Sequence, residues 1–264
     1  MKPAVHLDTL PWPKVAEARE TSGGILLLPV GATEQHGPHL PINTDSVIAS
    51  EVCAFASAET GVPVLPTLSY TVSSGHTGKW PGTFSLTHET FISTVREIVA
   101  WAAHSGWSRL LLVNSHFGND ASLRVAIEKL RLEFFGTLQI GLQNTFRLTE
   151  SIWEYFISDA EDLHANQAET DLLLHLAPET VDMAAVEDDP DRTENTCFSY
   201  PVAQTSLNGI TGAPSKGSAD KGKALFKEMG EALAQIVRRA SRESTPLPPE
   251  HWAHLSPQTG EVVT

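Results

Sequence analysis

Four runs of apolar residues along the chain predict the strands of a buried sheet. Their ranges are 23–30, 62–72, 108–116 and 138–144. Within each run the apolar side chains do not alternate cleanly with polar ones. Such runs are typical of parallel strands that are covered on both faces. The pattern therefore favours a mostly parallel sheet between two layers of helices.

The segments between and after these runs have the apolar spacing that is expected of helices. We predict helices over 44–59, 87–106, 119–136, 167–181 as far as Pro178, and 218–240. Two of them have a clear apolar stripe, formed by Leu123, Ile127, Leu130 and Phe134 and by Leu225, Met229, Leu233 and Val237. Because strand and helix alternate, the expected fold class is α/β, a three-layer α/β/α sandwich with a mostly parallel central sheet.

The second half of the chain also contains a long polar segment and a proline-rich end. Residues 183–217 are rich in polar residues, proline and glycine, which predicts a long functional loop. We expect residues 241–264 to form an extended arm. A chain of 264 residues can bury one large core without further support. The expectation is therefore a single domain over 1–264, with its core in 24–240.

Charge and cysteine content narrow the range of partners. The net charge is −14, which argues against nucleic acid and anionic membranes because both are bound through Lys and Arg. No segment approaches the ~18 apolar residues of a membrane span, and the start of the chain lacks the apolar core of a signal peptide. Cys53 and Cys197 lie far apart, and we expect both thiols to be reduced and buried. These features predict a cytoplasmic protein.

Side chains that can bind a metal or move a proton follow each apolar run. The first run continues into GATEQHGPHLPINTD, the second into SSGHTGKWPGTFSLT and the third into NSHFGND, and EDLHANQAET follows the fourth. Ligands of α/β proteins bind at the carboxyl ends of strands, where the loops converge. We therefore expect these four segments to form one cleft.

The first of these segments has ligand types that divalent metal ions prefer. Glu34 and His36 are two residues apart, so both project from one side of an extended segment, and Asp45 can reach the same point. This mixture suits zinc or manganese and is what a two-metal hydrolase needs. Each residue taken alone also has an ordinary interpretation, such as a solvated loop or, for Asp45, a helix N-terminus. His39 is equally consistent with a surface residue, and we leave it out of the ligand set.

Taken together, the segments resemble the creatininase (creatinine amidohydrolase) family. The resemblance rests on LPVGATEQHGPHLPINTD, GHTGKWPGTFSL, VNSHFGN and HANQAET, in this order, and on GITGAPSKGSADKG further along. It implies a three-layer α/β fold and a centre of two divalent ions, usually zinc or manganese and in some cases iron, that hydrolyses C–N amide bonds. It also implies a small-molecule substrate and a homo-oligomer, often a hexamer.

The resemblance implies five metal ligands when it is carried over residue by residue. Glu34 and His116 would hold one ion and His36 the other, with Asp45 as the bridge. Creatininase itself has a glutamate two residues after the counterpart of His116, where this chain has Gly118. Other branches of the family have glycine there and use the glutamate of the motif that corresponds to HANQAET. That glutamate is Glu169, the fifth expected ligand.

Three departures from the family pattern concern the substrate. Gly118 speaks against creatinine, and Ser115 and Asn166 stand where the family usually has glycine. Asparagine tolerates left-handed backbone geometry, so we expect Asn166 to keep the turn and to add an amide to the substrate pocket.

The remaining polar and aromatic residues receive expected roles in catalysis and binding. His164 is the candidate general acid for the leaving nitrogen, because imidazole exchanges protons near neutrality; alternatively it orients Glu169. His76 and Trp80 are candidates for substrate contacts, and Trp153 could line the same pocket or belong to the core.

The bond that is cleaved is left open by the sequence. The same bimetallic site could act on a formyl group, a peptide end, or a C–C or ester bond in a cyclic ketone, as in a keto-cyclitol. From a different class, the chain could be a metal-binding protein without catalytic activity.

Overall fold

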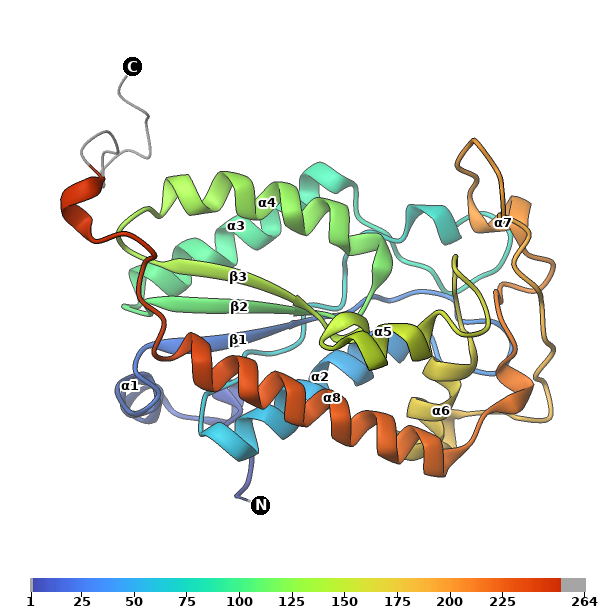
Figure 1. The fold of residues 1–264 in the computed structure, drawn as a ribbon, viewed down its shortest axis with the longest axis horizontal. Coiled ribbons are helices and arrows are strands. Elements are labelled where there is room, and N and C mark those ends of the chain that lie inside the picture. Colours follow the sequence, from blue (N-terminus) through green and yellow to red (C-terminus); the bar gives the residue numbers. More distant parts are fainter. Residues whose placement is uncertain (1, 253–264) are drawn as a thin grey trace.

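The structure is a computed structural model that describes residues 2–252, and it has one parallel sheet with helices around it (Figure 1). The strands are β1 (Ile25–Val30), β2 (Arg109–Asn114) and β3 (Gln139–Asn144). The helices are α1 (Trp12–Thr21), α2 (Thr44–Thr60), α3 (His88–His104), α4 (Asp120–Glu133), α5 (Glu150–Phe156), α6 (Gln167–Leu176), α7 (Val202–Thr205) and α8 (Ala219–Ala240). Each predicted helix is present, whereas α1, α5 and α7 were not predicted.

The three strands begin and end at the same level, which determines where the polar loops emerge. Their order is β1-β2-β3, and both pairs are parallel. In this register Val30 lies opposite Asn114, and Asn114 lies opposite Asn144. The loops that follow these residues therefore leave from one edge of the sheet, which faces α5, α6 and α7 in Figure 1.

The predicted strand at 62–72 is not a regular strand. The segment lies beside β1 but makes only isolated parallel bridges to it, such as the bridge between Val64 and Leu27. Pro63 and Pro66 explain the difference, because proline has no N–H to donate and so interrupts a ladder of hydrogen bonds. The prediction was right about a segment next to the sheet and wrong about its regularity.

The side chains of the strands alternate between two cores, one on each face of the sheet. On β1, Ile25 and Leu27 belong to the core beneath α2, α6 and α8, whereas Leu26 and Leu28 belong to the core beneath α3 and α4. Figure 1 shows α3 and α4 above the sheet and α2 and α8 below it. The fold is therefore the predicted three-layer α/β/α sandwich.

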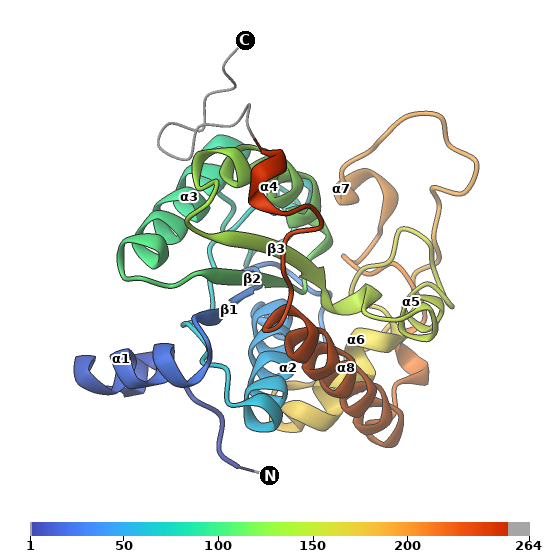
Figure 2. The ribbon, with the colours of Figure 1, turned by 60° about the vertical axis from the view of Figure 1, so that its left-hand side comes forward.

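Helices α6 and α8 approach closely because a glycine stands at their contact; in Figure 2, α6 lies directly behind α8. A Cβ on Gly222 would lie 1.7 Å from the carbonyl oxygen of Asp171. The two backbones therefore touch at this point, and the start of α6 is fixed relative to α8. The predicted stripe of α8 is buried in the same core and consists of Leu225, Met229, Leu233 and Val237.

The thiols and the C-terminal segment differ in part from the expectation. Cys53 and Cys197 are both unpaired, but only Cys53 is buried, so the expected burial is wrong for Cys197. The expected arm at 241–264 is described as far as residue 252, where Trp252 packs edge-on against Phe135. Within residues 2–252, no helix has both the length and the apolar character needed to cross a bilayer.

Candidate metal centre

Four chain segments bring ionisable side chains together at the edge where the strands end. The loop after β1 carries Glu34 and His36, the first turn of α2 carries Asp45, and His116 follows β2. Glu169 comes from the first turn of α6. All five predicted ligands are buried, with at most 4 % of any one of them exposed. The structure thus gathers the complete predicted set.

Asp45 lies between two groups of potential ligands. Its Oδ2 is 3.3 Å from Nδ1 of His116, and its Oδ1 is 3.5 Å from Nε2 of His36. Glu34 completes the first group, with its Oε2 beside the His116 ring at 3.2 Å from Nε2, the nitrogen that is not the ligand atom, and Glu169 completes the second, 3.9 Å from Nε2 of His36. Ligands that are each ~2.1 Å from a tetrahedral ion lie ~3.4 Å apart. The separations of 3.3 and 3.5 Å on either side of Asp45 therefore fit two ions that share this carboxylate.

Several buried atoms in these two groups have no hydrogen-bond partner among the described residues. They are Oε1 and Oε2 of Glu34, Oδ2 of Asp45, Oε2 of Glu169 and Nε2 of His36. Each unpartnered buried polar atom costs ~1–3 kcal/mol, and more when it is charged, and native proteins seldom leave such atoms unpaired. A divalent cation would satisfy all of them, so the residues present fit a metal centre.

In both His36 and His116, one ring nitrogen donates a hydrogen bond and the other, which faces Asp45, is left free. Nδ1–H of His36 donates to the backbone carbonyl of Glu34 at 3.0 Å, so Nε2 keeps its lone pair. Nε2–H of His116 donates to the carbonyl of Val72 at 2.8 Å, so Nδ1 keeps its lone pair toward Asp45. Histidines that bind metals commonly donate their second N–H in this way.

Charges within the site shift the pKa values of its members. Burial lowers the pKa of the two imidazoles, but the neighbouring carboxylates outweigh it and raise the pKa of His36 to about 10 and that of His116 to about 9. Burial also raises the pKa of Glu169, to about 7. For Asp45 the two imidazoles outweigh burial and hold the pKa well below its usual range. Protons and cations therefore compete for the same atoms.

His164 lies beside the ligands with a defined tautomer. Its Nε2–H donates to the carbonyl oxygen of Gln35 at 2.7 Å, so Nδ1 keeps its lone pair, 3.4 Å from Oε1 of Glu34. Burial and the nearby rings of His76 and His36 lower the pKa of His164 well below its ordinary value. The ring is therefore neutral near pH 7. Its Nδ1 can accept a proton or, with Glu34 and His36, bind an ion.

A cavity of about 320 Å³ opens beside the ligands. The predicted residues that line it are Asp45, His76, His116, His164 and Glu169. Residues that were not predicted also line it, among them Phe117, Glu161, Asp162 and Tyr200. The first three lie in the polar segments that follow the strands, so their position in the sequence could have identified them as residues of the cavity wall. Tyr200 comes from the loop at 183–217, where no pattern distinguishes it.

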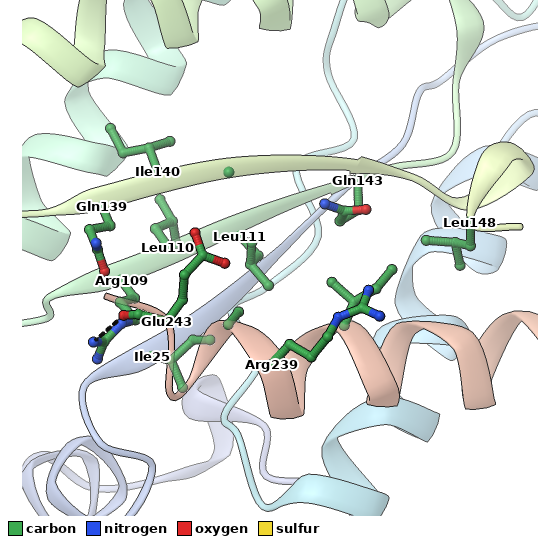
Figure 3. Close-up of a pocket in the computed structure, with 13 residues that line it drawn as sticks. Ile25, Arg109, Leu110, Leu111, Gln139, Ile140, Gln143, Leu148, Arg239 and Glu243 are labelled. Atoms are coloured by element: carbon green, nitrogen blue, oxygen red, sulfur yellow. Dashed lines mark hydrogen bonds between the residues drawn. The ribbon is translucent and has the colours of Figure 1, made fainter. Parts of the chain in front are cut away.

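A second hollow, of about 400 Å³, lies between the sheet and the end of α8 (Figure 3). Arg109, Arg239 and Glu243 are among its lining residues, and no candidate ligand is. The Arg109 guanidinium donates to backbone carbonyls, including that of Glu243 at 3.2 Å. Ligand sites are recognised by polar groups that converge on one point, and the candidate ligands converge on the smaller of these two cavities.

The aromatic candidates for substrate contacts lie in different places. His76 lines the cavity, with Nδ1 3.5 Å from Oε1 of Glu34. Trp80 is not among the described residues that line it, and the Lys79 ammonium lies over its ring at 4.5 Å. Trp153 packs against the core beneath α2, α6 and α8. Only His76 is therefore placed to form a wall of this cavity.

The expectations for Asn166 are not met. Its backbone is extended, with φ −82°, and the left-handed residue is Ala165, with φ 49°. Its side chain caps α6 by accepting from N–H of Glu169 at 3.2 Å, and it donates to Phe156 and Asp159 at 2.8 Å each. The amide is used within the fold and does not line the cavity. Asn166 thus orients the first turn of α6 rather than a substrate.

Gly118 lines the cavity and leaves no room for a side chain. A Cβ at this position would lie 2.5 Å from Nε2 of His116 and 2.8 Å from the carbonyl oxygen of Val72. Any larger residue would therefore have to shift a candidate metal ligand. The backbone agrees with the glycine that the sequence places here instead of a glutamate.

Proteins of known activity resemble this chain over most of its length. A sequence model of the family described as creatininase, creatinine amidohydrolase, matches residues 8–237. A creatinine amidohydrolase from Pseudomonas putida is 30% identical, covering 90% of this chain and 98% of that protein. A mycofactocin precursor peptide peptidase from Mycolicibacterium smegmatis is 32% identical, covering 81% and 85%. A 3-dehydro-scyllo-inosose hydrolase from Thermotoga maritima is 26% identical, covering 89% and 83%.

Solved structures of creatininases have the same fold. A crystal structure of creatinine amidohydrolase has a TM-score of 0.80 at 26% identity, covering 91% of this chain and 99% of that one. A Zn–Zn form of a creatininase variant has a TM-score of 0.76 at 28% identity, and an Mn form has 0.78 at 26%. Each of these two covers 89% of this chain and 98% of the other. The chain belongs to the creatininase family of metal-dependent hydrolases.

Proposed function

We propose that this protein hydrolyses a C–N amide bond with two divalent ions, zinc or manganese, with iron as a further candidate. The observation that carries the proposal is the position of Asp45, whose two carboxylate oxygens each face a different ligand group. A carboxylate in this position would serve both ions, as two-metal hydrolases require. The Zn–Zn and Mn forms of related creatininases support the choice of metals.

The ligands also set the charge of the site. Glu34 and His116 would hold one ion, His36 and Glu169 the other, and Asp45 both. When bound, two such ions lower the pKa of a water between them and polarise a carbonyl oxygen. Three carboxylates cancel three of the four positive charges. The single positive charge that remains would favour hydroxide over water and would stabilise negative charge on the substrate oxygen.

His164 is the proton carrier in this proposal. Its low pKa means that the neutral ring would first accept at Nδ1 the proton that the attacking water gives up and would then deliver it to the leaving nitrogen. The bond from Nε2–H to Gln35 keeps the ring in this orientation. The alternative that His164 orients Glu169 has less support, because no hydrogen bond joins them within residues 2–252 and Asn166 contacts Glu169 instead.

The substrate is a small molecule with a cyclic or formyl amide in this proposal. A cavity of about 320 Å³ is at the lower end of small-molecule sites. Creatinine itself is not the expected substrate, because Gly118 cannot supply the carboxylate that creatininase has at this position, and its surroundings admit no side chain.

A second candidate reaction is cleavage of a peptide end, and a third is opening of a keto-cyclitol ring. The identity of 32% with a peptide peptidase is as high as that with a creatinine amidohydrolase, and a cyclic-ketone hydrolase is also a relative. The same ligand set would serve each reaction, so these candidates differ in the cavity wall and not in the metal centre.

Metal analysis of the purified protein and of two Asp45 variants tests the mechanism. We expect two divalent ions per native chain, at most one in Asp45→Ala, and an intermediate content in Asp45→Asn, which keeps the shape but loses the charge. The melting temperature of the metal-free proteins controls for folding. A native protein that binds no metal after incubation with excess Zn²⁺ or Mn²⁺ would overturn the proposal.

A substrate screen separates the candidate reactions. It would contain cyclic amides, formamides, short peptides and keto-cyclitols, each assayed with native and with chelator-treated protein. We expect metal-dependent turnover of an amide and no turnover of creatinine. Turnover of a keto-cyclitol alone would replace the proposed reaction by the third candidate.

Self-association is also proposed, as a homo-oligomer that includes the hexamer implied by the family pattern. Light scattering after gel filtration would give a mass that is a multiple of 28.6 kDa. A single 28.6 kDa species at micromolar concentration would exclude a stable oligomer.

A further inference from the structure

His39 is a buried polar residue of the loop after β1 that the metal centre does not use. Only 1 % of it is exposed, so the surface position considered from the sequence is wrong. It belongs to none of the groups whose atoms are close enough to hold an ion. Its Nε2 lies 2.9 Å from Oγ1 of Thr170, the residue that follows Glu169 in α6.

The direction of this hydrogen bond follows from the other partner of Thr170. The Thr170 hydroxyl has one hydrogen, which it donates to the carbonyl oxygen of Asn166 at 2.8 Å. Towards His39 the hydroxyl can therefore only accept, so His39 donates from Nε2–H. Nδ1 of His39 is left without a partner. Burial and the nearby His36 lower the pKa of His39 to about 4, in agreement with a neutral ring.

The loop that carries His39 is closed on itself and is held at its tip. Near its base, N–H of Glu34 donates to the carbonyl of Ile42 at 2.8 Å, and His36 forms an antiparallel bridge with Leu40. His39 stands between these contacts and α6. Within residues 2–252, its bond to Thr170 is the only hydrogen bond between residues 34–42 and α6.

This bond joins the loop directly to α6, and these two segments supply the ligands of one ion. The loop is also held by His164 before α6 and by N–H of Asp182 after it, which donates to the carbonyl oxygen of His39 at 2.9 Å. His36 comes from the loop and Glu169 from α6, and their ligand atoms are 3.9 Å apart. Thr170 is adjacent to Glu169, and His39 is three residues from His36. A change in the distance between loop and helix would therefore change the ligand separation directly, whereas Glu34 and His116 of the other group do not involve α6.

We propose that His39 is a positioning residue, whose bond to Thr170 helps to set the spacing of His36 and Glu169 and thereby the affinity for the ion that these two residues hold. This inference rests on the proposed two-metal centre. It assigns His39 no contact with substrate or metal, and it predicts a selective effect: the affinity of one ion falls while that of the other is unchanged.

The test compares variants that remove or keep the hydrogen bond, using stepwise Zn²⁺ titration of metal-free full-length protein. His39→Leu and Thr170→Val remove the bond, whereas Thr170→Ser keeps the hydroxyl and His39→Gln keeps an N–H donor. We expect the variants that remove the bond to bind one of the two ions about tenfold less tightly and the other as tightly as native protein. The variants that keep the bond should stay close to native for both ions. The double variant should lose no more than either single one.

Two results would overturn the inference. One is a native-like affinity for both ions in His39→Leu and Thr170→Val, with native protein binding two ions; the proposed function would then stand and only the positioning role would fall. The other is an equal loss of both ions in Thr170→Val with an unchanged melting temperature of the metal-free protein. If His39→Leu does not fold, the pair Thr170→Val and Thr170→Ser decides alone. Native protein that binds no metal would instead refute the proposed function.

Discussion

Replacing Gly222 by alanine tests whether the contact between α6 and α8 positions the site. The added Cβ would lie 1.7 Å from the carbonyl oxygen of Asp171 and 2.4 Å from its carbonyl carbon. Contact distances for such pairs are above 3 Å, so the helices must separate by more than 1 Å. Both atoms that clash are backbone, so no side chain can rotate away. Asp171 is two residues from Glu169 in the same helix. A displacement of α6 would therefore also displace Glu169.

Two opposing terms set the size of the effect. Overpacking of a core costs ~1–3 kcal/mol, and a backbone clash belongs at the upper end. Alanine is ~1 kcal/mol better than glycine within a helix. The net loss is therefore ~2 kcal/mol of unfolding free energy, which lowers the melting temperature by ~4–8 °C for a protein of this size.

The assay is thermal unfolding of metal-free protein, followed by Zn²⁺ titration. Gly230→Ala is the matched control in the same helix, because its Cβ would meet the half-buried ring of Phe55, a side chain that can move. We expect a smaller loss of stability for the control, with metal binding unchanged because Phe55 is not part of α6, and for Gly222→Ala the larger loss together with weaker metal binding. A Gly222→Ala protein as stable as the native one would refute the argument.

Three further predictions concern the site and its surroundings. Zinc affinity at the site formed by His36 and Glu169 should rise at least about 100-fold from pH 6 to pH 8, since a pKa of about 10 obliges His36 to release a proton throughout and a pKa of about 7 obliges Glu169 to release one over part of the range; pH-independent titrations would contradict this. Asn166→Ala should lower the unfolding free energy by ~2–3 kcal/mol in urea, because it removes a cap and leaves buried groups unpaired; a loss below ~0.5 kcal/mol would contradict it. A thiol reagent should modify one cysteine, Cys197, in native protein and two in denatured protein, since burial raises the pKa of Cys53; two rapid modifications before unfolding would show that Cys53 is accessible.

The apolar pattern predicts well those elements whose buried side chains form a continuous run or a regular stripe within the element itself. β1 and β2 are continuous apolar runs that are buried on both faces, and α8 has a full stripe. Helix α1 buries only Ala18, so it has no stripe that a pattern could detect. The segment at 62–72 has the composition of a strand, but Pro63 and Pro66 prevent a regular ladder of hydrogen bonds, so it forms only isolated bridges.

The residues of the candidate site also fall into two groups, those whose role the local sequence predicts and those whose role depends on the tertiary fold. The five ligands stand in polar segments directly after strands or at helix starts, where residue type and position already indicate chemistry. The backbone of Ala165 and the capping role of Asn166 depend on contacts with Phe156 and Asp159, which are set only by the tertiary fold. Tyr200 reaches the cavity from a loop whose path no periodicity describes.

The segment at 62–72 gives the two edges of the sheet different capacities to recruit another strand. Beyond β1 the neighbouring backbone is interrupted by Pro63 and Pro66 and cannot offer a regular row of donors, so pairing with a further chain is blocked on that side. On the other side β3 pairs only with β2 within the described residues. Growth of the sheet, in assembly or in aggregation, is therefore directed to β3 alone.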